Sequence, residues 1–231
     1  MCGRFLLKSP VVELQGAFGF VERPNLEPRF NIAPTQTVAI VRLRANGDGR
    51  ELALVRWGLV PAWAKEPSIG SRMINARAEG IATKPAFRAA FRQRRALVLA
   101  DGFYEWRKVE GAGRKQPMLI RRRDHAPFAF AGLWERWRGP DGSLETCTIV
   151  TTAANALLAP IHDRMPVILG PADHEAWLDP ARPNGEALLR PCPTEELEAV
   201  PVSTRVNSPR HDDARLLEPE GEPVGAQGTL V

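Results

Sequence analysis

Residues 37–57, TVAIVRLRANGDGRELALVRW, contain the pattern that decides the fold. Two runs rich in Val, Ile and Leu, at 37–43 and 51–57, flank the tetrapeptide Asn-Gly-Asp-Gly at 46–49. β-Branched residues favour strands, and Asn-Gly or Asp-Gly between two such runs is a strong signal for a β-hairpin. We therefore predict two antiparallel strands here, as part of a larger sheet.

Short apolar runs separated by Gly, Pro and Asp turns continue along the chain. They predict further strands at 96–100, 103–107, 117–121, 127–134, 144–151, 167–169 and 201–207, and helices at 9–18, 84–93, 153–160 and 171–177. Ser9 is the expected N-cap of the first helix. Many short strands, few helices and no linker predict an α+β fold, with a single domain built on a largely antiparallel, barrel-like sheet and short flanking helices.

Composition favours a cytoplasmic protein without a metal. The 231 residues are 44% hydrophobic, which is enough for a sizeable core without staples. Cys2, Cys147 and Cys192 are far apart and form no Cys-x-x-Cys motif, so neither a disulfide framework nor a zinc site is expected. No apolar run approaches the roughly 18 residues of a membrane-spanning helix.

The charge pattern permits nucleic-acid binding without requiring it. The net charge is +4, and arginines cluster at 88–95 and 121–123. Arginine binds phosphates in a bidentate manner, which suits contact with a nucleic-acid backbone. A solvated cationic surface explains the same clusters equally well.

Cys2 has unusual chemistry if Met1 is removed. An N-terminal cysteine carries an amine and a thiol on adjacent carbons, and this 1,2-aminothiol can condense with an aldehyde to a thiazolidine ring. The same residue could instead act as an N-terminal nucleophile on a carbonyl group. For a cysteine considered alone, a frayed chain end is the simpler interpretation.

Two titratable residues could assist such chemistry. Glu105 lies between Tyr104 and Trp106 in a predicted strand, so its side chain points to the opposite face from theirs. That face is either solvated or a polar pocket in which the carboxylate could hold or deprotonate the amine of Cys2. His162, at a predicted helix-to-strand junction, is either an acid–base group or a surface histidine.

Three other residues are candidates for contact with DNA or sugar. Asn75 and Arg77 occupy alternate positions of an extended stretch and so share a face, where they could clamp a sugar and a phosphate. Alternatively, Asn75 is a buried turn amide and Arg77 pairs with Glu79 or another acid. Trp63, in a loop rich in Gly and Pro, could stack on a base or pack in the core.

Several separated motifs together resemble the SOS-response-associated peptidase (SRAP) family. They are residues 1–5 (MCGRF), 29–34 (RFNIAP), 56–63 (RWGLVPAW), 75–79 (NARAE), 100–106 (ADGFYEW), 161–166 (IHDRMP), 201–203 (PVS) and 206–207 (VN). Each motif is weak alone, but their order is highly specific. The resemblance covers residues 1–218 as one domain and leaves residues 219–231 as a tail that is expected to be disordered.

The resemblance implies a sensor of abasic sites in single-stranded DNA. Cys2 would form a covalent thiazolidine crosslink to the ring-opened sugar, in a lyase-like reaction of the SOS response that shields the lesion. It also implies that Glu105 handles the protons of the amine, His162 assists ring opening, and Asn75 orients the sugar. Contacts to DNA are expected from Arg4, Arg77 and Trp63, in a cytoplasmic, nucleoid-associated monomer that needs no cofactor and no membrane.

A second function remains open from the residues. Cys2, Glu105 and His162 could instead form a thiol peptidase or N-terminal-nucleophile hydrolase that acts on peptide bonds, including the bond that releases Met1. A non-covalent single-strand-binding module is the third alternative. Convergence of Cys2, Asn75, Glu105 and His162 in one groove is the geometric requirement for the covalent reaction.

Overall fold

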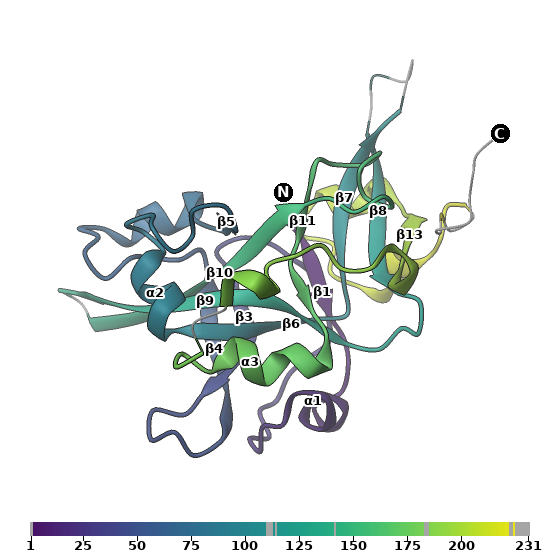
Figure 1. Ribbon diagram of the computed structural model, residues 1–231. Helices are drawn as coiled ribbons and strands as arrows, with labels where there is room; N and C mark the ends of the chain where they lie inside the picture. The colour runs from purple at the N-terminus through teal and green to yellow at the C-terminus, as the bar shows by residue number, and fades with distance from the viewer. Residues whose placement is uncertain are drawn as a thin grey trace.

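The structure is a computed structural model that describes residues 2–109, 113, 115–140, 142–182, 185–221 and 224. Its centre is a ring of five strands. Strands β10, β4, β3, β6 and β9 pair in this order, and β9 then pairs with β10 to close the ring. The bounds of these strands are β3 Thr37–Leu43, β4 Arg50–Trp57, β6 Arg95–Ala100, β9 Phe128–Gly139 and β10 Gly142–Ala153. This barrel-like core, with short helices around it, makes the fold α+β as the sequence predicts (Figure 1).

The predicted hairpin is confirmed as β3 and β4. Their antiparallel register runs from Thr37 opposite Arg56 to Leu43 opposite Arg50. The turn between them uses Gly47 and Gly49 at positive φ angles of 76° and 81°, which L-residues rarely adopt. The turn-forming residues therefore set the register of the first two barrel strands.

Three short strands extend the barrel sheet, and these carry the ends of several motifs. They are β5 Asn75–Arg77, β11 Arg164–Pro166 and β12 Ile168–Leu169. The first two pair with β10, and the third pairs with β9. Most pairings are antiparallel, but β10 runs parallel to both β4 and β5.

A second sheet packs against the barrel, and its strand order is β13-β8-β7-β1-β2. The bounds are β1 Phe5–Leu7, β2 Arg29–Ile32, β7 Gly102–Lys108, β8 Lys115–Arg122 and β13 Leu197–Pro201. The Phe5 ring joins the two sheets, because its centroid lies 5.1 Å from that of Trp57 and 5.8 Å from that of Phe130. Both contacts are edge-to-face, the arrangement that aromatic quadrupoles favour.

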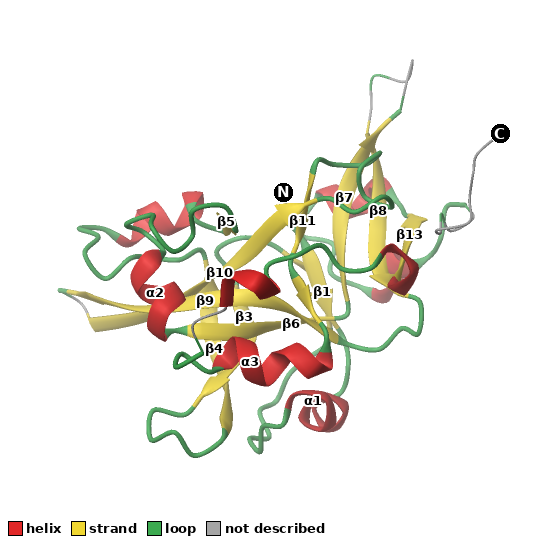
Figure 2. Cartoon of the chain, viewed as in Figure 1, coloured by secondary structure: helices red, strands yellow, loops and turns green. Residues whose placement is uncertain are grey.

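Short helices cover the outside of the sheets (Figure 2). The α-helices are α1 Val11–Phe18, α2 Arg88–Gln93 and α3 His174–Leu178, and the 3₁₀ helices are η1 Pro67–Arg72, η2 Pro171–Asp173, η3 Gly185–Leu188, η4 Thr194–Glu196, η5 Thr204–Asn207 and η6 Ala214–Leu217. Each α-helix buries an apolar face, such as Leu14 and Phe18 of α1. In the described part of the chain, none of the helices combines the length and apolar character that crossing a membrane requires.

Some local predictions were wrong. The helix expected at 153–160 is a series of turns, because β10 continues to Ala153 and pairs with β11. The strand expected at 201–207 ends at Pro201, and Ser203 then caps η5 by accepting a hydrogen bond from the Arg205 N–H. Ser9 does not cap α1, because its hydroxyl is hydrogen-bonded to Asp101 instead.

The C-terminal tail lies partly outside the described residues. Residues 222, 223 and 225–231 of the predicted disordered tail are not described. Within the described part, Pro219 forms a β-bridge with Val202, and Val224 forms one with Ala199. These bridges attach the start of the tail to the second sheet near β13.

A close contact between two glycines holds the loop that follows β4. Gly58 has a φ of 126°, and a Cβ at this position would lie 2.6 Å from the Gly70 carbonyl oxygen. A Cβ on Gly70 would meet the Gly58 oxygen at 2.4 Å. Only glycine at both positions allows these backbone segments to approach each other in this way.

We expect Gly58→Ala to lower the free energy of unfolding by about 3 kcal/mol, since backbone strain and a forced shift of the Gly70 segment both contribute. Urea unfolding of purified variants measures this change. Gly47→Ala is the matched control, because Gly47 also has a positive φ of 76° but a Cβ there would meet nothing within 4 Å. An equal loss of stability in both variants would show that the close contact contributes nothing.

Candidate active site

The backbone that leads into β1 fixes the position of Cys2. Phe5 pairs with Phe103 of β7 and with Ile32 of β2, and the Tyr104 N–H donates to the Arg4 carbonyl oxygen at 2.9 Å. Continuing this antiparallel ladder by one step brings the start of the chain to the level of Glu105. Cys2 is fully buried there, so the interpretation of a frayed end does not hold for this residue.

Glu105 lies in a pocket and not on a solvated face. Tyr104 donates its hydroxyl proton to the Phe30 carbonyl oxygen at 2.8 Å, and Trp106 donates its indole N–H to Asn207 Oδ1 at 2.7 Å. Both contacts lie on the outer side of the second sheet. Glu105 points to the opposite face, toward the barrel, and is only 3% exposed. The alternation of side chains along β7 therefore holds as predicted.

Burial and neighbouring charges tune the acid–base groups of this pocket. Burial raises the pKa of the Glu105 carboxyl, and the nearby His162 works against this rise. Burial also raises the pKa of the Cys2 thiol far above its usual range, and the negative charge of Glu105 raises it further. Cys2, Glu105 and His162 are therefore close enough to interact electrostatically.

Asn75 contacts the chain segment that carries Cys2. Its Nδ2 donates to the Cys2 carbonyl oxygen at 2.8 Å. β5 presents this amide because it pairs in parallel with β10, with Asn75 opposite Ile149. Asn75 Oδ1 is buried and has no hydrogen-bond partner among the described residues, so it remains an available acceptor directly beside Cys2.

His162 is positioned by the turn before β11. Its Nδ1 lies 2.8 Å from Asp163 Oδ1, and the Arg164 N–H donates to the same nitrogen at 3.0 Å. The side chain of Arg164 donates to both carboxylate oxygens of Glu79, at 2.6 and 2.9 Å, and to the Thr151 carbonyl oxygen. This ion pair ties the His162 turn to the residues that follow β5.

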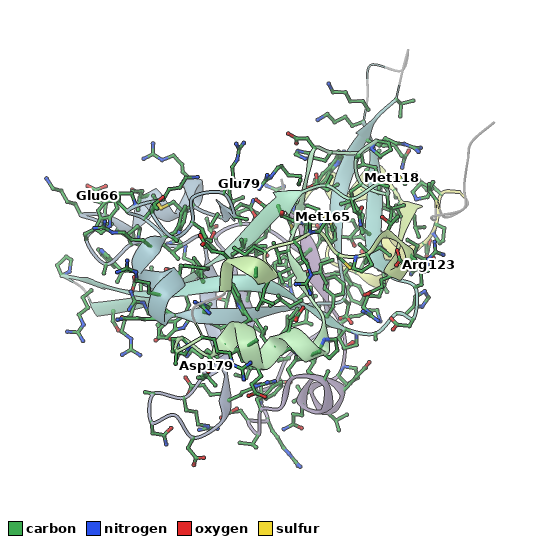
Figure 3. All side chains as sticks on the ribbon, in the orientation of Figure 1. Glu66, Glu79, Met118, Arg123, Met165 and Asp179 are labelled. Carbon is green, nitrogen blue, oxygen red and sulfur yellow. The ribbon has the colours of Figure 1, made fainter. Side chains whose placement is uncertain are left out.

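Figure 3 labels Glu79, which belongs to this ion pair, and Met165, which follows Arg164 in the chain. The two labelled residues lie on the same side of the molecule. The main contact of the Glu79 carboxylate is with Arg164, and not with Arg77 as one of the alternatives expected. Arg77 is exposed at the end of β5. Asn75, by contrast, is half-buried and contacts Cys2. Of these two residues, Asn75 therefore belongs to the candidate site, whereas Arg77 is a cation on the surface.

The other predicted DNA contacts differ in their exposure. Trp63 is 60% exposed in the loop between β4 and η1, which removes the core alternative for its side chain. Arg4 is half-buried, and its Nη1 donates to Asn31 Oδ1 at 2.8 Å and to the Val206 carbonyl oxygen at 2.7 Å. Arg4 therefore holds the start of β1 against the C-terminal segment.

Asn31 has a structural function that sequence reasoning missed. Its Nδ2 donates to the carbonyl oxygens of Ser208 and His211, at 3.0 and 2.6 Å, while its Oδ1 accepts from Arg4. One buried amide thus joins the β1 lead-in to the segment after η5. The only sequence signal is an asparagine inside the otherwise apolar stretch 30–34.

No group of three or more His, Cys, Asp or Glu side chains that could hold a metal ion occurs among the described residues. The candidate site comprises Cys2, Asn75, Glu105 and His162. It combines a thiol, a hydrogen-bond acceptor, a carboxyl group with a raised pKa and an imidazole. These groups suit proton transfer and addition to a carbonyl compound.

Comparison with known proteins identifies relatives over nearly the whole chain. A family model described as SOS response associated peptidase (SRAP) matches residues 1–209. The abasic site processing protein YoqW of Bacillus subtilis is 41% identical, with 94% of this chain and 99% of YoqW covered. The abasic site processing protein HMCES of Gallus gallus is 32% identical, with 95% of this chain and 78% of HMCES covered.

A solved structure supports the same relationship. The X-ray crystal structure of a protein from Bacteroides thetaiotaomicron superposes with a TM-score of 0.84 at 27% sequence identity. The match covers 94% of this chain and 99% of the Bacteroides protein. The fold is therefore shared over nearly the whole of both chains.

We expect the buried carboxyl of Glu105 to make folding stability depend on pH. Above about pH 4.5, the usual pKa of a glutamate carboxyl, the unfolded chain loses this proton, whereas the folded chain keeps it up to the raised pKa. The folded state then binds more protons, so the free energy of unfolding falls as pH rises through this range. Glu105→Gln should remove the fall and gain stability relative to wild type from pH 4.5 upward, as measured by urea unfolding between pH 4 and 8.

Glu79→Gln is the control with the opposite sign. The hydrogen bond from Arg164 lowers the pKa of Glu79, so its contribution is present above the unfolded pKa and is lost as pH falls through the folded pKa. This variant should be less stable than wild type at neutral pH and converge with it in acid. Parallel curves for wild type and Glu105→Gln would contradict the assignment of a raised pKa to Glu105.

Proposed function

Because the chain belongs to the SOS response associated peptidase (SRAP) family, we propose that it processes abasic sites in DNA, the activity named in its curated relatives. One observation carries the proposal. Cys2 is buried between an amide that binds its carbonyl oxygen and a carboxyl that interacts with its thiol. A chain end held this firmly is suited to covalent reaction at its own amine and thiol.

The reaction that we propose requires removal of Met1. The freed amine of Cys2 attacks the aldehyde of the ring-opened abasic deoxyribose, a C–N bond forms, and water leaves to give an imine. The thiol sulfur then adds to the imine carbon, and the thiol proton ends on the nitrogen. The product is a thiazolidine that joins the protein to the strand and shields the lesion.

The electrostatics favour this order of steps. Burial and the charge of Glu105 keep the Cys2 thiol protonated, so the amine is the first nucleophile. Glu105 accepts a proton from the ammonium form of the amine, and its raised pKa makes it a stronger base than an ordinary carboxylate. Hydrolysis of peptide bonds by Cys2 fits this site less well, because it needs a thiolate.

The remaining site residues act on the sugar. His162, whose side chain is 31% exposed, is placed to donate and accept protons during ring opening and loss of water. Asn75 holds the Cys2 carbonyl with its Nδ2 and offers its Oδ1 to a sugar hydroxyl. Asn75 comes from β5 and His162 from the turn before β11, and both of these strands pair with β10.

The strand that we propose as substrate is single-stranded DNA, bound by a cytoplasmic, nucleoid-associated monomer. Arg77 would bind a phosphate from its exposed position, and Trp63 would stack on a neighbouring base. Arg4 would contribute at the edge of the site while its Nη1 holds Asn31. Self-removal of Met1 by the same residues is the alternative activity, and it fits this site less well for the same reason, because the Cys2 thiol stays protonated.

We expect the chain, once shown by mass spectrometry to lack Met1, to form an adduct with a single-stranded oligonucleotide that carries an abasic site. Denaturing gel electrophoresis detects the adduct as a shifted band. Cys2→Ser should abolish the stable adduct, because a hydroxyl does not form the thiazolidine, while borohydride should still trap an imine. Absence of any adduct with the processed wild-type chain would refute the function.

Cys192→Ser is the matched thiol control, because Cys192 is buried in another part of the core. It should form the adduct at the wild-type rate. Glu105→Gln should slow the reaction by about 10²–10⁴-fold, the usual contribution of general acid–base catalysis. A wild-type rate in Glu105→Gln would remove Glu105 from the mechanism while leaving Cys2 as the nucleophile.

We expect Trp63→Ala to weaken binding of single-stranded DNA by about 1–3 kcal/mol through loss of base stacking. Fluorescence anisotropy with an oligonucleotide that carries a tetrahydrofuran abasic analogue measures binding without crosslinking. Trp63→Phe should retain most of the affinity, and neither variant should change the urea midpoint, because the side chain is largely exposed. Equal affinity of Trp63→Ala and wild type would show that Trp63 lies outside the DNA path.

A further inference from the structure

The two arginine clusters of the sequence have different environments in the folded chain. In the cluster at 121–123, Arg121 pairs with Glu198 at 2.7 Å, and Arg122 pairs with both Asp124 and Glu196. The Arg123 Nε donates to the Glu195 carbonyl oxygen. Acidic side chains and a carbonyl of the protein therefore neutralise or bind this cluster.

The cluster at 88–95 is neutralised only at its end. Arg94 pairs with Glu135 at 2.7 Å, and Arg95 is buried with its guanidinium over the rings of Phe91 and Trp177. By contrast, Arg88 and Arg92 are exposed, and no ion pair joins either of them to another described residue. Two cations without acidic neighbours thus remain on α2.

The local fold aligns these two arginines with a third cation. The Lys84 N–H donates to the Gly80 carbonyl oxygen, and the Arg88 N–H donates to the Lys84 carbonyl oxygen, at 3.0 and 2.9 Å. Arg88 and Arg92 are four residues apart in α2, so they lie on one face about 6 Å apart along the helix axis, and Lys84 lies in the turn that leads into this helix. We refer to these three residues as the cationic ridge.

The buried side of this segment explains why the cationic ridge faces the solvent. Phe87, Ala90 and Phe91 are buried in the main core, and they fix the orientation of α2. Arg88 and Arg92 flank a shallow hollow that Ala89 and Gln93 also line. The ridge is therefore a fixed feature of the surface and not a set of side chains on a free loop.

The chain connects the candidate site to the cationic ridge over a few residues. The chain leaves β5 at Arg77, turns at Gly80 with a φ of 73° and enters the ridge at Lys84. In the view of Figures 1 and 2, β5 lies between β11 and α2. Arg77 is thus the first in a series of exposed cations that leads away from Asn75 toward α2.

We propose that the cationic ridge is a second binding surface for the phosphate backbone of the DNA strand that flanks the lesion. The inference rests on the proposed function. Guanidinium groups bind phosphates in a bidentate manner, and exposed cations without acidic neighbours give this binding its full electrostatic gain. The ridge reads no base, so it holds any sequence while Cys2 reacts.

The test compares Arg88→Gln/Arg92→Gln with Arg23→Gln/Arg123→Gln. All four positions are exposed, and both double variants lower the net charge by the same amount. Binding is measured by anisotropy between 50 and 200 mM salt. One single-stranded probe carries the tetrahydrofuran analogue with two nucleotides on each side, and two longer probes extend it in the 5′ or the 3′ direction.

The Arg88/Arg92 variant should bind one of the longer probes about 25-fold more weakly than wild type at 0.1 M salt. The magnitude of the slope of log K against log salt should also be smaller by about 1.4, because each neutralised phosphate contributes about 0.7 on single strands. The short probe should bind to this variant and to wild type alike, and the control variant should match wild type on all probes. The direction of the affected probe gives the polarity of the bound strand.

Two outcomes would overturn the proposal. In the first, the Arg88/Arg92 variant binds both longer probes with the affinity and the salt slope of wild type. In the second, the control variant loses as much affinity as the Arg88/Arg92 variant, which would show that net charge alone is responsible. Crosslinking of a short oligonucleotide with a true abasic site separates this result from the proposed function. Wild type and both double variants should crosslink it at the same rate, whereas failure of wild type to crosslink would refute the proposed function itself.

Discussion

The hydrogen bonding of β10 is the constraint on which the rest of the structure depends. This strand pairs with β9 and β4 to close the barrel, and further along its length with β5 and β11. A strand has only two edges, so the four partner strands must pair with successive parts of the length of β10. The partners at the far end, β5 and β11, are the segments that bring Asn75 and His162 to the site.

The N-terminal residues reach this place through the second sheet. β1 pairs with β2 and β7 on its two edges, and the Phe5 ring packs between Trp57 and Phe130 of the barrel. Arg4 and Asn31 fix the same segment from the C-terminal side. The position of Cys2 is therefore determined by β pairing, by an aromatic contact and by one buried amide, all of which form only when both sheets are in place.

Local patterns predict the elements of this fold better than their pairing. The hairpin of β3 and β4 follows from residues 46–49 and the apolar runs that flank them, and the opposite directions of Tyr104 and Glu105 follow from strand alternation. The parallel pairings of β10 with β4 and with β5 join residues far apart in sequence and leave no local signal. For the same reason the chemistry of Cys2, Glu105 and His162 is visible as residue types, while the internal role of Arg4 depends on contacts with Asn31 and Val206.

The distribution of ion pairs separates cations that stabilise the protein from cations available to a ligand. Arg164 lies in a bidentate pair with Glu79, and Arg42 lies between Glu51 and Glu145 with its guanidinium 4.0 Å from the centroid of the Trp134 ring. Their charges are already balanced within the fold, so a phosphate would have to displace a carboxylate to bind them. Arg77, Arg88 and Arg92 are exposed without such a pair among the described residues, so a phosphate would bind them without breaking an ion pair. The surface that runs from β5 to α2 therefore carries cations whose charge is not balanced by an ion pair within the described part of the fold.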